Sequence, residues 1–524
     1  MKQALKYMFT NNNQTANIHQ SGFRGLIIVI LSLLSFTGCT NLDEVLFDKI
    51  TMDDYGKTSS EVQTIVGGAY ATLRGFNDTN TGGTLSYPTG EFVFFLNECT
   101  SDEACIPTRG TDWYDGGRYQ QLQYHTWDAN NATVLSAWKY NFQGVANINT
   151  IIYMVNKSSL TQDDKNVVNA ELRGLRAYYY YNLLDLYGGV PIVTSFETTD
   201  VPKQASRDSV FRFVEKELIE ITELLPSGIA YSRFTQNVAY TLLARLYLNA
   251  EVFTGTPRWK DCLTACEKVK GFTLNSNYFD NFATDNDQKA EEIIFAIPYD
   301  HKQNTQGNYL ASMTYHYNQK YAFSIDGTYP WCGNGICAKP AVYGTFDAAD
   351  TRRKSLLVGD QLSKATGEVI MMDNGSPLSY TVDIGDYTKA LQNEGARLHK
   401  YQWRADDKWE RDNDLVLMRY AEVIMMKAEA NYRQGFTTTA ANLVNQLRKR
   451  AGLGDISTLD NASLETEWLH EFIFEGLRRN TNIRFGTFFN SGWNKSVTPA
   501  YRGVFPIPQS VLDLNKNLIQ NTGY

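Results

Sequence analysis

The sequence contains few of the residues from which metal and catalytic centres are usually built. Its 524 residues include only 6 histidines, which are scattered, and neither a Cys-x-x-Cys nor a His-Glu-x-x-His motif occurs. Zinc sites need such ligands at close spacing. Walker A, Gly-x-Ser-x-Gly and Gly-rich nucleotide-binding motifs are also missing. We therefore expect no catalytic residues, no cofactor and no metal.

Two further functional classes, nucleic-acid binding and glycoside hydrolysis, lack support in the sequence. The formal net charge is −8 and no run of Lys and Arg interleaves with aromatics, so nucleic acid is a poor partner. A glycoside hydrolase would need two carboxylates that flank a cleft. The chain has 57 Asp and Glu residues, but no motif singles out a pair.

Long apolar runs are also missing. The run from Leu26 to Phe36 follows Arg24 and is interrupted only by two serines. It is too short to span a bilayer as a helix, and a short apolar run with a basic flank is typical of a secretory signal.

The end of this run is Phe36-Thr37-Gly38-Cys39, which resembles a lipoprotein cleavage site. We predict a signal peptide at 1–38, acylation of Cys39 and a tether at 39–60, with Met8 as an alternative start. Acyl chains anchor strongly through their buried CH₂ groups. The acidic pair after Cys39 resembles a surface-export tag. Three basic and no acidic residues precede Cys39, so the remainder carries a charge of −11.

Six cysteines remain after Cys39. Export permits disulfides, but the pairing of Cys99, Cys105, Cys332 and Cys337 stays open. The other two, at 262 and 266, are four residues apart on an expected helix, a spacing that strains a disulfide.

Helical periodicity dominates two parts of the chain. Apolar residues recur at helical spacing in 61–74, 134–156, 163–187, 207–225, 236–249, 259–268, 414–432 and 438–451. Helix pairs with short connectors predict a mainly α, tetratricopeptide-like repeat scaffold of about four pairs. Gly, Asn, Asp and Thr dominate 75–133 and 270–411, which we expect to be loop-rich with short strands.

Five ordered blocks resemble one known family. They are 172–193 (LRGLRAYYYYNLLDLYGGVPIV), 415–430 (LVLMRYAEVIMMKAEA), 445–453 (NQLRKRAGL), 471–486 (EFIFEGLRR with IRFG) and 504–524 (VFPIPQ with the final NTGY). Together with the lipoprotein signal they resemble the SusD/RagB family of outer-membrane nutrient-uptake lipoproteins.

The resemblance implies a single domain at 61–524, with helical repeats at about 61–74, 134–268 and 412–479 and a ligand-binding part at about 75–133 and 270–411. It implies a lipid-anchored protein on the outer face of the outer membrane. Such a protein would bind a glycan and pass it to a TonB-dependent, SusC-like transporter.

Aromatic residues are abundant at 13%, and two loop stretches place them among polar residues. A glycan site needs flat aromatic faces for sugar rings and polar groups for hydroxyls. The candidates are Arg109, Asp112, Trp113, Tyr114, Tyr309, Tyr315 and Trp331. Trp113, Tyr309 and Trp331 best match the aromatic arc of starch-binding relatives. The alternative is that each packs beneath its own loop.

Other conspicuous residues are better explained by structure. Four consecutive tyrosines at 178–181 point all round a helix, so we expect them in the core. Arg478, Arg479 and Arg484 with Glu471 and Glu475 suggest an ion-pair network. A calcium site is a weaker alternative to solvated carboxylates for Asp285, Asp287, Asp412 and Asp414. A peptide ligand, or a scaffold without a ligand, remain alternative functions.

Overall fold

The structure is a computed structural model that describes residues 56, 58–75, 91–289, 291–300, 302, 308–310, 312–328, 330–401, 403 and 412–524. The predicted signal peptide and Cys39 lie outside the described residues. None of the described helices is both long and apolar enough to cross a membrane.

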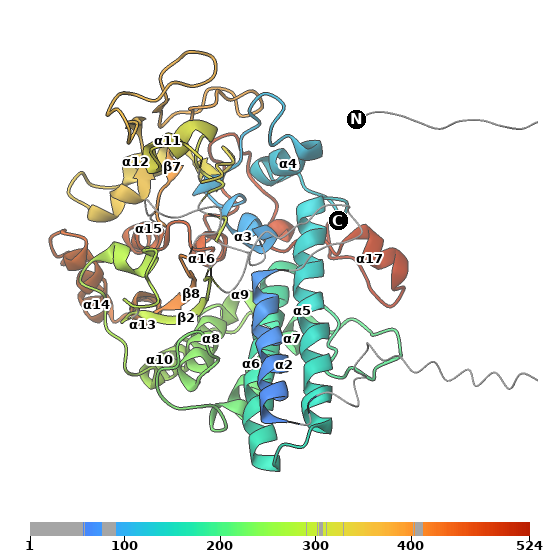
Figure 1. Ribbon diagram of the computed structural model, residues 1–524. Coiled ribbons are helices and arrows are strands. Elements are labelled where there is room, and N and C mark those ends of the chain that lie inside the picture. Colours follow the sequence, from blue (N-terminus) through green and yellow to red (C-terminus); the bar gives the residue numbers. More distant parts are fainter. Residues whose placement is uncertain are drawn as a thin grey trace, which may run out of the picture. The chain divides into compact units, whose positions relative to one another are not determined.

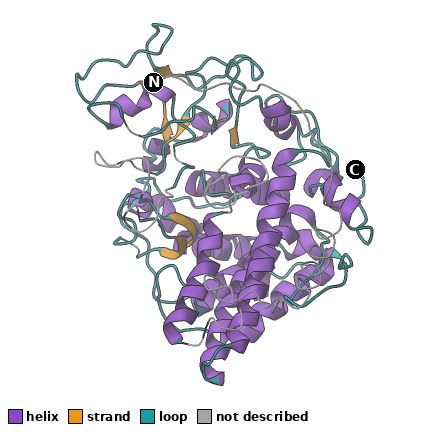
Figure 2. Ribbon diagram, turned by 45° about the vertical axis from the view of Figure 1, so that its right-hand side comes forward, coloured by secondary structure: helices purple, strands orange, loops and turns teal. Residues whose placement is uncertain are grey.

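The described chain is mostly helical, with few and short strands, which confirms the predicted fold class (Figures 1 and 2). Its longer helices are α2 (Ser59–Ala71), α5 (Ala132–Lys157), α6 (Gln162–Tyr187), α7 (Arg207–Thr222), α8 (Gln236–Leu248), α10 (Trp259–Lys268), α13 (Tyr420–Arg433), α14 (Thr437–Arg450) and α15 (Asn461–Phe472). Shorter ones are α3 (Glu91–Glu98), α4 (Arg118–Tyr124), α9 (Ala250–Thr254), α11 (Lys320–Phe323), α12 (Pro340–Thr345), α16 (Arg478–Phe485) and α17 (Gln509–Leu514).

The long helices form one continuous stack. Helix α5 packs on α6, α6 on α7, α7 on α8, α8 on α10, α10 on α13 and α13 on α14 (Figure 1). Each helix thus covers a face that its neighbour could not bury alone, which is the logic of a helical-repeat scaffold. The predicted tetratricopeptide-like arrangement agrees with this stack.

Helix α6 lies at the centre of the stack and follows from local signals. Its N-cap Thr161 accepts a hydrogen bond from Asp164 N–H, and the helix ends at Gly188 with a φ of 74°. The four tyrosines at 178–181 are all buried, as predicted. A Cβ on Gly174 would lie 2.3 Å from the ring of Phe234, so only glycine permits this packing.

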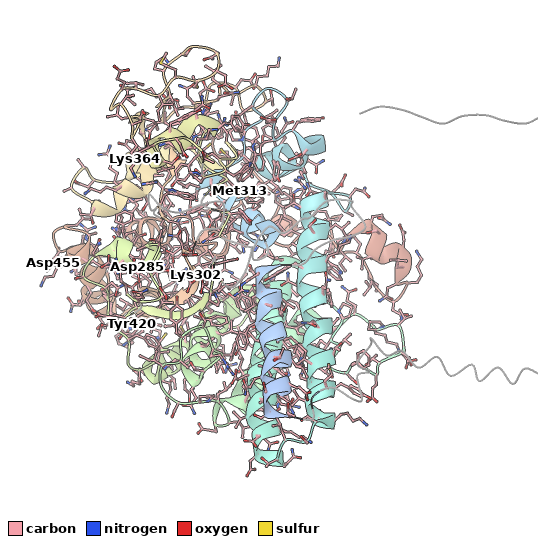
Figure 3. The ribbon with its side chains drawn as sticks, viewed as in Figure 1. Asp285, Lys302, Met313, Lys364, Tyr420 and Asp455 are labelled. Atoms are coloured by element: carbon pink, nitrogen blue, oxygen red, sulfur yellow. The ribbon has the colours of Figure 1, made fainter. Side chains whose placement is uncertain are left out.

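A short antiparallel sheet joins the two ends of a long insertion, and we call this sheet the neck. Strand β2 (Ile293–Ile297) leaves the helical stack and β8 (Leu415–Arg419) returns to it, with Ile297 opposite Leu415. Between them lies the loop-rich part of the chain, in which Figure 3 labels Met313 and Lys364.

Six two-residue strands organise this part. They are β1 (Ala104–Cys105), β3 (Cys337–Ala338), β4 (Leu356–Leu357), β5 (Gly359–Asp360), β6 (Ser379–Tyr380) and β7 (Arg397–Leu398). Strand β1 pairs with β3, β4 with β7 and β5 with β6, all antiparallel. The β1–β3 pair therefore joins the loops after α3 to the insertion.

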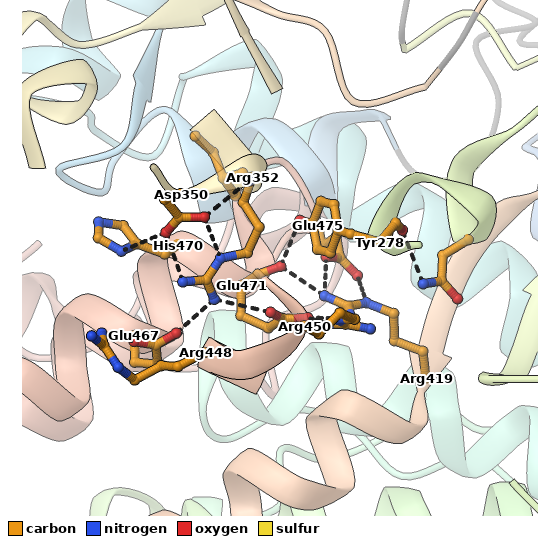
Figure 4. A network of polar contacts seen from close by, with 12 residues as sticks. Tyr278, Asp350, Arg352, Arg419, Arg448, Arg450, Glu467, His470, Glu471 and Glu475 are labelled. Atoms are coloured by element: carbon orange, nitrogen blue, oxygen red, sulfur yellow. Dashed lines mark hydrogen bonds and ion pairs between the residues drawn. The ribbon is translucent and has the colours of Figure 1, made fainter. Parts of the chain in front are cut away.

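A buried ion-pair network fixes the neck to α15 (Figure 4). Arg419, the last residue of β8, donates to Glu292 and Glu471 at 2.7 Å each. Arg450 donates to Glu292 at 2.6 Å, and Arg352 to Glu471 at 3.0 Å. These side chains are buried, so the network holds strand, helix and insertion in one arrangement.

The predicted ion pairs of this region have other partners than expected. Arg478, Arg479 and Arg484 do not form ion pairs with Glu471 or Glu475. Their partners are Asp102, Asp185 and Glu429, respectively. The sequence could not rank these partners, because Asp102 and Asp185 lie about 300 or more residues away along the chain.

Candidate functional site: aromatic loops on a clamped framework

The loop that carries Trp113 is clamped against residues 387–394. Thr108 N–H donates to Tyr387 O at 3.1 Å, and Ala390 N–H donates to Thr108 O at 2.9 Å. The Tyr387 hydroxyl donates to Ile106 O at 2.8 Å. Backbone bonds of this kind fix a loop without a core of its own.

Arg109 belongs to this clamp. It forms a turn with Asp112, in which the two residues exchange backbone hydrogen bonds of 3.0 and 3.1 Å. Its guanidinium is buried and donates to the carbonyls of Glu394, at 2.7 Å, and Leu391. The expected direct contact of Arg109 with a ligand is therefore corrected: its donors face carbonyls inside the protein.

Trp113 is the best-fixed aromatic of the loop. Its backbone is left-handed, with a φ of 61°, which is unusual for a non-glycine residue. Its indole N–H donates to Gly333 O at 2.7 Å, and a Cβ on Gly335 would lie 2.5 Å from the ring. The half-buried indole thus lies against Gly333 and Gly335 of the insertion, which we call the glycine strip.

Trp331 lies against the same strip. A Cβ on Gly333 would lie 2.7 Å from its indole, which is also half-buried. Backbone hydrogen bonds join the strip to 312–315: Gly333 N–H to Ser312 O at 3.0 Å, and Gly335 N–H to Met313 O at 2.7 Å. The two predicted stretches, far apart in sequence, thus meet at these glycines.

Polar side chains lie beside the indoles. The Tyr317 hydroxyl donates to Asp112 across the two loops, and Tyr114 is 53% exposed. Burial, followed by the Asp112 carboxylate, raises the pKa of Tyr317. We call Asp112, Trp113, Tyr114, Tyr317 and Trp331 the aromatic loop surface. Contact of this surface with a ligand stays a prediction.

Tyr309 and Tyr315 are not part of this surface. Their exposed fractions are 7% and 0%. The Tyr315 hydroxyl shares a hydrogen bond of 2.6 Å with His399 Nδ1. Because both rings are buried, the expectation that they stack on a ligand is corrected: they support the loops from beneath.

The four carboxylates considered for calcium do not form a cluster. Asp285, labelled in Figure 3, pairs with Lys289 at 3.1 Å. The two oxygens of Asp414 accept hydrogen bonds from Tyr231, at 2.6 Å, and Tyr299 N–H, at 2.7 Å. The described residues contain no group of three or more His, Cys, Asp or Glu side chains that could hold a metal ion.

The sequence reasoning missed the glycine strip and the clamp at 387–394. Gly333 and Gly335 flank Asn334 in a pattern that indicates only a turn. Their role depends on indoles from elsewhere in the chain, which a local pattern does not predict.

Two family models match the chain. Residues 105–248 match a model described as "Starch-binding associating with outer membrane", and residues 383–497 match one described as "SusD family". The chain belongs to the SusD/RagB family. The first match includes the Trp113 loop, whereas the stretch with Trp331 and the glycine strip lies between the two matches.

Named relatives agree with this membership. The "Starch-binding protein SusD" of Bacteroides thetaiotaomicron is 26% identical over 495 residues, which covers 82% of this chain and 85% of that protein. The "SusD-like protein P2" of Formosa agariphila is 26% identical over 446 residues, covering 82% and 81%. The first name describes a starch-binding protein and the second a SusD-like protein.

Solved structures share the SusD-like fold. "Surface glycan-binding protein A" from Bacteroides thetaiotaomicron has a TM-score of 0.72 at 22% identity, covering 89% of this chain and 100% of that one. The same protein in complex with laminarihexaose has a TM-score of 0.71 at 21% identity, covering 88% and 99%.

Proposed function

We propose that this SusD-family chain is a lipid-anchored surface protein that binds an oligo- or polysaccharide and delivers it to a TonB-dependent, SusC-like transporter in the outer membrane. Family membership supports the setting, since one matching family model is described as associating with the outer membrane. The names of its relatives, among them starch- and laminarin-binding proteins, support a glycan as the ligand.

The observation that carries the proposal is the fixation of Trp113. Its indole is held by one hydrogen bond to Gly333 and by close contact with Gly335, which has no side chain. A sugar ring presents an apolar C–H face that packs on such a plane. Because the indole is already ordered, binding costs little conformational entropy at this residue.

Hydroxyl groups at the edges of a sugar need polar partners. Asp112 and the Tyr317 hydroxyl are already joined to each other, and the exposed Tyr114 supplies a second phenol. Asp115 and Arg118 form a pair at 3.3 Å on the same loop. Carboxylate, guanidinium and phenol groups together can both donate to and accept from hydroxyls.

Native affinity electrophoresis tests this function. The soluble form, residues 41–524, is run in gels that contain laminarin, starch or another polysaccharide. We expect retardation by at least one glycan, and a loss of about 2 kcal/mol, or about 30-fold in Kd, in Trp113→Ala and Trp331→Ala.

The matched control is Phe436→Ala, which removes a 57% exposed aromatic outside the loops and should not change retardation. Retardation that survives in both tryptophan variants would move the site away from this surface. Absence of retardation by every glycan would favour a peptide ligand for the same kind of transporter.

A further inference from the structure

A groove lies at the C-terminal end of α6. None of the residues that line it belongs to the aromatic loop surface. Residues 187–189, 203–207, 517 and 519–522 line a hollow of about 670 Å³. A second hollow of about 520 Å³ continues it along Ala500, Tyr501, Gly503 and Val504. The two share Arg207, Val504, Asn521 and Thr522, so they form one groove.

The charge of this groove is opposite to that of the chain. Lys203 and Arg207 line it, and the described lining residues include no Asp or Glu. The whole chain carries 57 acidic and 49 basic residues. The nearby carboxylate of Asp208 is engaged by Arg212 at 2.9 Å and does not line the groove.

Arg207 forms no ion pair with a carboxylate among the described residues, although the Asp185 carboxylate, which pairs with Arg479, raises the pKa of Arg207 against the effect of burial. One guanidinium nitrogen donates to Val252 O at 3.1 Å and the group lies over the Phe253 ring, but its buried Nε has no hydrogen-bond partner. Burial lowers the pKa of Arg207 to about 10. An anion that enters the groove would compensate this partly desolvated charge.

The walls of the groove are fixed before any ligand binds. Gln204 donates to Gly189 O at 3.0 Å and accepts from Ile519 N–H at 2.8 Å. Asn521 donates to Tyr187 O at 2.9 Å. Helix α7 starts here, and its first N–H groups have no partner within the helix, which adds positive potential.

We propose that this groove binds the carboxylate or sulfate group of an acidic saccharide through Arg207 and Lys203. The saccharide class rests on the proposed function, whereas the anionic group is argued from the groove itself. A rigid, open groove of several hundred Å³ with amide and hydroxyl walls suits one or a few sugar units.

Calorimetric titration of the soluble form with tri-galacturonate, the neutral trimer of galactose and sodium sulfate tests the site. We expect tri-galacturonate to bind at least tenfold tighter than the neutral trimer, with an affinity that falls as salt rises. Arg207→Met, which keeps the contact with Phe253, should weaken it at least tenfold, and exposed Lys203→Met severalfold.

The control Lys216→Met removes an exposed charge farther along the same helix and should change nothing. Trp113→Ala should also leave tri-galacturonate binding intact, so the proposal for the groove can be refuted without refuting the proposal for the aromatic loop surface, and the reverse. Equal affinity for the acidic and neutral trimers, or no effect of both Arg207→Met and Lys203→Met, would overturn the proposal. Equally tight, Arg207-dependent binding of tri-glutamate would overturn the saccharide class.

A second, independent observation concerns two cysteines. Cys105 in β1 lies directly opposite Cys337 in β3, and both are fully buried. Opposed residues of an antiparallel pair have Cα atoms about 4.5–5.5 Å apart, within the range that a disulfide needs. Arg109 donates to Cys337 Sγ at 3.4 Å. Although burial opposes it, the Cys105 thiol and the nearby arginines lower the pKa of Cys337 to about 6.

We infer that Cys105 and Cys337 form a disulfide in the exported protein. The Cys337 thiolate attacks a disulfide of an oxidoreductase, and the Cys105 thiolate then displaces that enzyme. Two thiols lose two protons and two electrons, and the oxidoreductase disulfide becomes two thiols. The bond would tie the strand before the Trp113 loop to the strand after the glycine strip.

Mass spectrometry of the full-length lipoprotein, extracted under an alkylating agent without reductant, tests the bond. We expect the linkage in the parent, in Cys99→Ser and in Cys332→Ser, and its loss in Cys105→Ser and Cys337→Ser. Complete alkylation of all thiols after denaturation, or linkage through Cys99 or Cys332, would overturn the inference.

Discussion

Glu471 is the carboxylate on which the buried network depends, and Glu471→Gln is its most direct test. Its oxygens accept from Arg419 at 2.7 Å, from Arg352 at 3.0 Å and from Arg450. All four side chains are almost fully buried. Glutamine has the same shape, but it removes the charge and aims an N–H donor at guanidinium groups.

The magnitude follows from the charge balance. The cations of the network are Lys400, Arg352, Arg419, Arg448 and Arg450. Its anions are Glu292, Asp350, Glu467, Glu471 and Glu475. The variant therefore leaves one buried positive charge uncompensated, which costs about 3–5 kcal/mol.

Thermal unfolding of the soluble form, followed by circular dichroism, measures this cost. A unit of this size has an unfolding entropy of about 1 kcal/mol/K, so Tm should fall by about 3–5 °C. The arginines hold the pKa of Glu471 well below its usual range, despite burial. Its stabilisation is therefore fully present above about pH 4.5. The difference in Tm should be equal at pH 5.5 and pH 6.5, below the pKa of Lys400, which burial lowers to about 8.

The control is Glu220→Gln, the same change at an exposed ion pair. Glu220 pairs with Arg173 at 2.5 Å, and the Glu220 side chain is 45% exposed. Exposed pairs contribute about 0–1 kcal/mol, so its Tm should change by at most about 1 °C. An equal effect of the two substitutions would refute the reasoning that burial makes the network costly to break.

Three further substitutions test particular contacts. Burial raises the pKa of Asp414 to about 7, so the stability that its protonated form contributes is lost as pH rises from about 4 to 7. The Tm of Asp414→Asn minus the Tm of the parent should therefore increase by at most about 4 °C from pH 4 to pH 8, and a constant difference would contradict this. Gly335→Ala places a Cβ 2.5 Å from the Trp113 indole and should weaken glycan retardation as much as Trp113→Ala does, with unchanged circular dichroism. Gly174→Ala overpacks α6 and should lower Tm by about 1–3 °C, whereas Gly67→Ala on α2, where a Cβ meets nothing, should not lower it.

Helix ends with local signals were predictable from the sequence. Helix α6 was expected at 163–187 and spans Gln162–Tyr187, because Thr161 and Gly188 mark its ends. The helix expected at 414–432 instead begins at Tyr420, since Leu415–Arg419 forms strand β8. That run is apolar at nearly every position, so periodicity could not separate strand from helix; pairing with β2 decided it.

The candidate site was predictable only as two loops. Composition singled out the stretches with Trp113 and Trp331, and the structure brings them together at the glycine strip. Composition could not tell exposed Tyr114 from buried Tyr315, because the burial of Tyr315 depends on His399, 84 residues further along the chain. Contacts over such separations have no local signature.

The aromatic loop surface is built from residues inside the family-model matches and from residues outside them. The first loop and the helices of the stack other than α10 lie within residues matched by the family models. Tyr317, Trp331 and the glycine strip lie between 248 and 383, outside both matches. The buried network and the β2–β8 neck hold this stretch on the stack through residues that do not reach the surface. The insertion can therefore change its surface side chains without disturbing the scaffold. Ligand identity should follow the loops rather than family membership, so exchanging the insertion's surface residues should change glycan preference at constant Tm.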